Sequence, residues 1–166
     1  MKVIRARRSI RRFTPEPVPD EAIKTLLEAA MSAPSAGNQQ PWEFVVIKDR
    51  AVLDRIPDVH PYAQMCRQAQ ASVVVCGNLE RDSHRGFWVQ DCAAATQNIL
   101  IAATDIGLGS VWCGVHPRED RVSGLRKLLC LPDHIVPLSL IPIGHPAENK
   151  PASERFDPAR IHHDKW

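Results

Sequence analysis

Apolar and polar positions alternate along the chain in a way that predicts several helices and strands in one domain, residues 1–166. Apolar residues recur at helical spacing over residues 20–32, 51–56, 87–106 and 117–129, and more weakly over 62–70. Apolar runs of strand length occupy residues 42–47, 71–77, 109–115 and 138–143. The periodicity by itself favours a parallel α/β sheet, because strands and helices alternate.

Two of these elements allow a sharper expectation. The run 71–77 is almost wholly apolar, so it is expected to be a central strand that is buried on both faces. The helix over 51–56 is expected to start after a cap at Asp49 and to stop at Pro57, because proline lacks the backbone donor that a helix interior needs.

The helix over 87–106 carries alanines on one side and larger apolar residues on another. It therefore fits burial against a partner subunit or, equally, the central core helix of a monomer.

The N-terminal segment breaks the pattern with five arginines and a serine between positions 5 and 12. If this segment is a short helix, Arg7 and Arg11 share one face. Guanidinium groups match phosphate oxygens bidentately, so such a face would act as a phosphate clamp. A solvated basic arm is the alternative. A nucleic-acid arm is a third interpretation, weakened because no basic patch with interleaved aromatic residues follows.

A second break lies at residues 33–42, which read APSAGNQQPW. The prolines exclude a regular helix or strand and indicate a rigid loop. Its amide side chains each supply a donor and an acceptor on a short arm, which suits the edge of a planar heterocycle. An ordinary turn between a helix and a strand is the alternative.

The composition, 44% hydrophobic and 24% charged residues, is typical of a globular protein, and a net charge of +2 argues for neither nucleic acid nor a membrane as partner. No apolar run is long enough for a membrane span, and the first residues do not read as a secretory signal. The five cysteines form no C-x-x-C pair and mostly lie in apolar runs, so we expect buried, reduced thiols in a cytoplasmic protein. Fingerprints of dinucleotide-binding, P-loop, serine-hydrolase and zinc sites are missing.

Four segments, in this order along nearly the whole chain, resemble the FMN-dependent nitroreductase family: RRSIRRF at 7–13, APSAGNQQPW at 33–42, GLGSVWCG at 107–114, and Arg155 in the tail. The resemblance implies an α+β, nitroreductase-like fold, with a mainly antiparallel sheet flanked by helices, in place of the parallel sheet that the periodicity favours. It further implies an intertwined homodimer in which the C-terminal tail, residues 150–166, packs on the partner subunit.

The resemblance also implies an FMN site at the dimer interface, built from both subunits. One subunit would contribute the arginine segment, a run of backbone past the flavin ring with a donor near N5, and a tail cation: Arg7, Arg8, Ser9, Arg11, Val111, Trp112, Cys113, Gly114 and Arg155. The other would contribute Pro34, Ser35, Ala36, Asn38 and Gln40. The chain departs from the family at Cys113, where many members are acidic, and at Ser153, where many carry a second cation; Lys150 is the nearest substitute here.

The function that the resemblance implies is FMN-dependent oxidoreduction. NADH or NADPH would deliver hydride to the flavin and leave, and an electron-poor small molecule such as a nitroaromatic or a quinone would then be reduced, by a ping-pong mechanism. No catalytic side chain and no metal are expected. The alternatives are a non-catalytic flavin-binding or redox-sensing protein, and another flavin reaction on the same scaffold, such as dehalogenation or flavin fragmentation.

Overall fold

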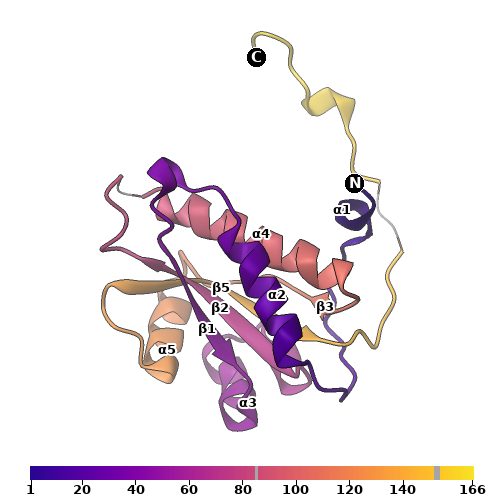
Figure 1. Ribbon diagram of the computed structural model, residues 1–166, viewed down its shortest axis with the longest axis vertical. Coiled ribbons are helices and arrows are strands. Elements are labelled where there is room, and N and C mark those ends of the chain that lie inside the picture. The colour runs from indigo at the N-terminus through magenta and orange to yellow at the C-terminus, as the bar shows by residue number, and fades with distance from the viewer. Residues whose placement is uncertain (85, 152–153) are drawn as a thin grey trace.

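A twisted sheet with helices on both faces forms the body of the molecule (Figure 1). It is seen in a computed structural model that describes residues 1–84, 86–151 and 154–166. The strands follow the order β1-β2-β5-β3, with β4 also paired to β5, and each described pairing between strands is antiparallel. Their bounds are β1 Trp42–Ile47, β2 Ala71–Asn78, β3 Gly109–Ser110, β4 Cys113–Gly114 and β5 Ile135–Gly144.

This sheet confirms the α+β class that the resemblance implied, and the parallel sheet favoured by periodicity is wrong. The reason is that a strand buried on both faces has the same apolar run in either direction, so its composition carries no information about direction. As predicted, β2 is central, and all its residues are buried. Its side chains alternate between two cores: Val73 and Val75 belong to one, and Val74 and Cys76 to the other.

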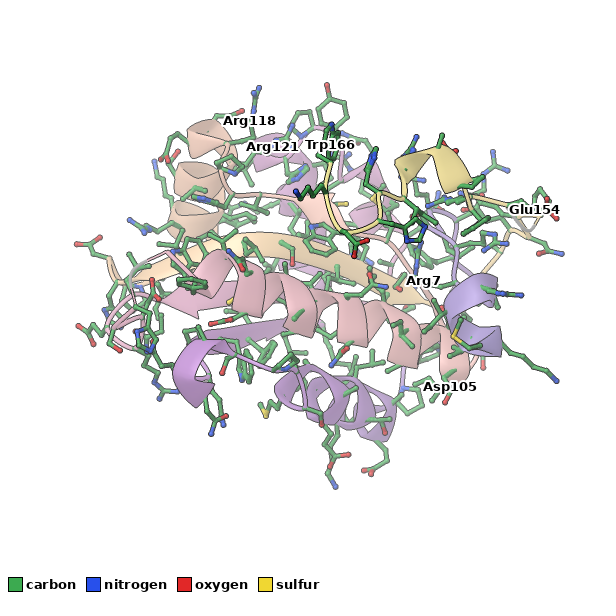
Figure 2. The ribbon with its side chains drawn as sticks, turned by 90° about the horizontal axis from the view of Figure 1, so that it is seen from above. Arg7, Asp105, Arg118, Arg121, Glu154 and Trp166 are labelled. Carbon is green, nitrogen blue, oxygen red and sulfur yellow. The ribbon has the colours of Figure 1, made fainter. Side chains whose placement is uncertain are left out.

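The helices form one layer on each face of the sheet. The first core unites the sheet with α2 and α4, and the second unites it with α3 and α5. Figure 2 shows α5 on one side of the sheet and α4 and α2 on the other. The bounds are α1 Lys2–Ala6, α2 Asp20–Met31, α3 Arg50–Val59, α4 Trp88–Asp105 and α5 Glu119–Leu129, with short 3₁₀ turns η1 Ala36–Asn38, η2 Gln64–Arg67 and η3 Pro158–Arg160. Within the described ranges, no helix is long and apolar enough to cross a membrane.

Several predicted boundaries are corrected by the structure. Asp49 does cap α3, accepting from the Ala51 N–H at 2.8 Å, but the helix continues through Pro57 to Val59. The missing N–H falls near the helix end, and Pro57 is buried in return, so a single lost bond is tolerated. Residues 62–70 contain only the η2 turn, and the last helix begins at Glu119 and not at residue 117. The strand expected over 109–115 is split into β3 and β4.

The longest helix, α4, packs by one side on the sheet and leaves the other half-exposed. Its side chains Cys92, Ala95 and Ile99 are fully buried in the first core. On the opposite side, Gln97 and Ile101 are only partly covered. This helix also links two distant parts of the chain, because α2 runs along it and α1 lies beside its C-terminal end (Figure 1).

Candidate functional site

The arginine segment runs along the edge of the sheet in extended form. The helix α1 ends at Ala6, and Arg7 already has extended backbone, with φ −53° and ψ 128°. Ser9 then forms a parallel bridge with Ser110, and the Ile10 N–H donates to the Ser110 carbonyl at 2.9 Å. The conditional prediction that Arg7 and Arg11 share a helical face is therefore wrong. The backbone pairing with β3 instead brings the arginines next to the segment 111–114.

Three arginines converge at the start of this segment. Burial lowers the pKa of the Arg7 guanidinium, and the positive charges of Arg155 and Arg8 lower it further. Like charges held this close repel one another, and an anion bound among them would remove the repulsion. The fold thus holds Arg155 close to Arg7 and Arg8, although it lies more than a hundred residues from them in the chain.

Arg8 also ties the start of the tail to the end of α1. Its guanidinium donates to the carbonyls of Arg5, Arg7 and Pro151, each at 2.7 Å. This leaves fewer of its donors for a ligand than the sequence analysis assumed.

Two further tail residues fix the arginine segment from the other side. The Lys150 ammonium donates to the Ser9 carbonyl at 2.5 Å and forms an ion pair with Glu148 at 3.3 Å. Glu148 in turn accepts from the Arg11 N–H at 2.5 Å, which together with Lys150 lowers the pKa of its carboxyl group. A cavity of about 200 Å³ lies between Arg8, Lys150 and the end of α4. Lys150 thus fits the role of substitute cation, while Ser153 lies outside the described residues.

The segment 111–114 presents one side chain outward and buries another. Trp112 is 36% exposed, whereas Val111 and Cys113 are buried in the second core. Burial raises the pKa of the Cys113 thiol to about 11, against the opposing effect of Arg11 and Arg121, and its Sγ lies 3.9 Å from the Met65 Sδ. Cys113 is therefore a neutral packing residue on the inner side of the segment, and Trp112 is the side chain available to a ligand.

Two residues that the sequence analysis missed hold the end of this segment. The Gly114 carbonyl accepts from the His60 Nε2 at 2.9 Å and from the Arg121 guanidinium at 2.8 Å. His60 follows the end of α3 and is 1% exposed, and its pKa is lowered by burial and by Arg121. No sequence pattern connects these positions, since only the packing of α3 against α5 brings them together.

The amide loop, residues 33–41, is held in an unusual backbone conformation. Gly37, Asn38 and Gln40 have φ of 55°, 55° and 50°, which only glycine adopts without strain. The Gln40 N–H donates to the Ser35 Oγ, and the Gln40 amide donates to the Asn38 Oδ1, both at 3.0 Å. Asn38 and Gln40 remain exposed, so their amides are displayed outward from a fixed loop.

Contacts from outside the loop brace it against the N-terminal end of α4. The buried carboxylate of Asp91 accepts from the Ala36 N–H at 3.0 Å. Gln39 and Ser83 bond reciprocally, at 2.6 Å from the Gln39 Nε2 to the Ser83 Oγ and 2.9 Å from the Ser83 N–H to the Gln39 Oε1. The loop position is therefore set by α4 and not by the arginine segment.

The two groups of predicted site residues consequently lie at opposite ends of α4 (Figure 1). The amide loop contacts Asp91 in the first turn, whereas Arg8 shares its cavity with Thr104 near the last turn. At about 1.5 Å per residue, these two points of the helix are roughly 20 Å apart. One chain therefore brings together the arginine segment, residues 111–114 and Arg155, and holds Pro34, Ser35, Ala36, Asn38 and Gln40 elsewhere.

Comparison with known proteins agrees with the resemblance seen in the sequence. The model of the nitroreductase family matches residues 4–76 and 57–145. A protein of Methanothermobacter thermautotrophicus, provisionally named NADH dehydrogenase/NAD(P)H nitroreductase, is 49% identical over the whole chain and 87% of its own length. A crystal structure from Parabacteroides distasonis with the same provisional name superposes with a TM-score of 0.96 at 41% identity, covering 99% of this chain and 97% of the other.

A second similar structure contains a cofactor. It is a provisionally named nitroreductase from Desulfovibrio desulfuricans in complex with FMN, with a TM-score of 0.87, 34% identity, and coverage of 99% of this chain and 96% of the other. The chain belongs to the nitroreductase family. In the described part of the chain, no three His, Cys, Asp or Glu side chains are grouped to hold a metal ion.

Proposed function

We propose that the protein is an FMN-dependent oxidoreductase that uses NADH or NADPH to reduce electron-poor small molecules such as nitroaromatics or quinones. The observation that carries the proposal is that Arg7, Arg8 and Arg155 gather beside the segment 111–114, where a bound anion would offset their like charges. The names of the relatives, which refer to NAD(P)H nitroreductases and in one case to an FMN complex, support the same reading.

The residues at the arginine cluster fit a ribityl phosphate. A phosphate dianion favours several fixed cations with bidentate donors, and Arg7 and Arg155 provide such groups. Lys150 adds a cation whose position is fixed by Ser9 and Glu148. The residues proposed for the phosphate are therefore Arg7, Arg155 and Lys150, with Arg8 fixing the tail beside them.

The flavin ring would lie along the segment 111–114. This segment directly follows Ser110, which pairs with Ser9 of the arginine segment. The amides of Asn38 and Gln40 would meet its polar edge, but in their own chain they lie at the end of α4 opposite to the arginine cluster. We therefore infer a homodimer in which the amide loop of each copy completes the site of the other. The half-exposed side of α4, which connects the two ends, would face the partner.

Bound FMN would supply the redox chemistry, accepting hydride from NAD(P)H and donating it to the substrate in two half-reactions. The chain itself would bind the phosphate, orient the ring with backbone and amide groups, and present Trp112 to the substrate. No side chain is assigned a proton transfer, since the raised pKa of Cys113 keeps its thiol protonated. A cytoplasmic location and a single domain stay predictions.

The visible absorption spectrum of the purified protein tests this function most directly. We expect two flavin bands and, after denaturation, about one released FMN per chain. The bands should bleach anaerobically with NADH or NADPH and return when a quinone or nitroaromatic is added. A colourless protein that also fails to take up added FMN would overturn the proposal, and a yellow protein that neither nucleotide reduces would favour the flavin-binding alternative.

A further inference from the structure

The end of the segment 111–114 is fixed by an arrangement that packing alone does not require. One backbone oxygen, the Gly114 carbonyl, accepts two side-chain donors, His60 at 2.9 Å and Arg121 at 2.8 Å. The donors come from different helices, because His60 caps the C-terminus of α3 and Arg121 lies inside α5. The carbonyl is thereby held from two directions, so the Gly114 peptide cannot rotate without breaking both bonds.

Each of the two donor side chains also has one buried polar atom without a hydrogen-bond partner among the described residues. These atoms are the Nδ1 of His60 and the Nε of Arg121. A buried polar atom without a partner costs free energy, and such atoms in native structures call for an explanation. Because Nε2 faces a carbonyl, it must carry the proton, so His60 is held as a single neutral tautomer.

Arg121 is itself fixed by a third residue. Its guanidinium lies 5.1 Å from the centre of the Tyr62 ring, and the Tyr62 side chain is 72% exposed. At this distance the ring and the guanidinium form a cation–π contact, which adds to the two hydrogen-bonded partners at the Gly114 carbonyl. Figure 2 shows Arg121 on α5, and Arg118 just before this helix, on the opposite side of the sheet from α4.

We propose that His60 and Arg121 are positioning residues that fix the Gly114 carbonyl and thereby set the distance and orientation of the segment 111–114 toward the flavin. This inference rests on the proposed function, which places the flavin along that segment. The pair acts through the Gly114 backbone, so it would govern the redox properties of the bound cofactor more than its affinity, which the arginine cluster is proposed to provide by binding the phosphate.

The test compares variants of the full-length, FMN-loaded protein that remove or keep the donors. His60→Leu and Arg121→Met remove them, whereas His60→Gln keeps an N–H donor and Arg121→Lys keeps the charge. Arg118→Met is the matched control, since Arg118 is exposed and its side chain makes no hydrogen bond within the described part of the chain. The readouts are the midpoint potential of the bound FMN, the limiting rate of flavin reduction in single turnovers, and hydrogen exchange of the amides of residues 112–115 in the apoprotein.

We expect the two donor-removing variants to shift the midpoint potential and to lower the limiting rate on the order of tenfold or more, with faster exchange at residues 112–115. The half-saturating nucleotide concentration should change little, and His60→Gln should restore most of the rate. Wild-type potential and wild-type limiting rate in both donor-removing variants would overturn the proposal, whatever their stability. If His60→Leu does not fold, the comparison of Arg121→Met with Arg121→Lys decides by the same criteria.

These outcomes are distinct from a failure of the proposed function. A wild-type protein that binds no FMN would reject that function before any variant is measured, and this inference with it. A wild-type protein that binds and reduces FMN, together with variants that behave as wild type, would reject only the positioning role of His60 and Arg121.

Discussion

Arg7 is a half-buried cation held beside two others, and this makes it the most informative single position in the chain. Burial lowers the pKa of its guanidinium, and the charges of Arg155 and Arg8 lower it further. Arg8 differs, because three backbone carbonyls already occupy its donors. At the residue scale, therefore, we propose a ligand-binding role for Arg7 and a structural role for Arg8 within one short segment.

Replacing Arg7 by alanine should weaken FMN binding on the order of tenfold or more, because a charge-assisted bond to phosphate is lost. Titrating the apoprotein with FMN, followed by flavin fluorescence, measures the affinity. The matched control is Arg12→Ala, in an exposed position of the same segment. Equal affinities of the two variants and the wild type would remove Arg7 from the phosphate site.

The cysteines should react with thiol reagents at very different rates. Burial raises the pKa values of Cys66 and Cys76 to about 12 and of Cys113 to about 11, and it also raises that of Cys92. At pH 8 these thiols stay protonated and covered, so they should be inert. Cys130, which the sequence analysis did not separate from them, is exposed.

We therefore expect a thiol-specific reagent at pH 8 to modify one cysteine per native chain, and all five after denaturation. Cys130→Ser should abolish the native reaction. Rapid native modification of the Cys130→Ser protein would contradict the assignment.

The amide loop is the element whose conformation depends most on its neighbours. Residues 33–42 could be recognised as a rigid loop because their prolines exclude regular structure. Its orientation could not be predicted, since Asp91 and Ser83 lie some fifty residues further along the chain. The same holds for Pro57, whose burial outweighs the helix-stopping tendency of proline.

Asp91→Ala should loosen this loop. Hydrogen bonds to charged groups contribute about 1.5–3 kcal/mol, so we expect a loss of that order in the free energy of unfolding, together with weaker FMN binding. Urea denaturation of the apoprotein gives the first quantity and FMN titration the second.

The control for Asp91→Ala is Asp105→Ala, at the exposed opposite end of α4 (Figure 2). Its acidic side chain meets the negative end of the helix dipole, so its removal should be neutral or slightly stabilising. An Asp91→Ala protein as stable as this control would show that the loop does not depend on Asp91.

At the scale of the whole molecule, the two halves of the proposed site are separated by the length of α4 (Figure 1). The tail, with Phe156 and Trp166 83% and 100% exposed, also extends apolar side chains beyond the body of the chain. Both features are expected of a protein that completes its site with a second copy.

A mixing experiment tests this shared site. One variant is Arg7→Ala, and the other combines Asn38→Gly with Gln40→Gly, which removes the amides but permits the positive φ. Each alone should bind FMN weakly. After joint unfolding and refolding, half of the dimers should be mixed and carry one intact site of two, so about a quarter of all sites should regain wild-type affinity. No regain would place both halves of the site in one chain.

From the sequence alone, periodicity, proline and capping predicted most helices and strands and the rigid loop, because these signals act within a few residues. The predicted helix over 62–70, the unbroken strand over 109–115 and the helix stop at Pro57 are wrong. The arginines and amides also fit a solvated arm and an ordinary turn, so the candidate binding residues come from the family resemblance and stay predictions. The family resemblance implied an antiparallel sheet and a site that joins Arg155 to Arg7, and only the tertiary structure decided the order and register of the strands and the hold of His60 and Arg121 on Gly114. These depend on contacts between residues far apart in the chain, which local pattern does not encode.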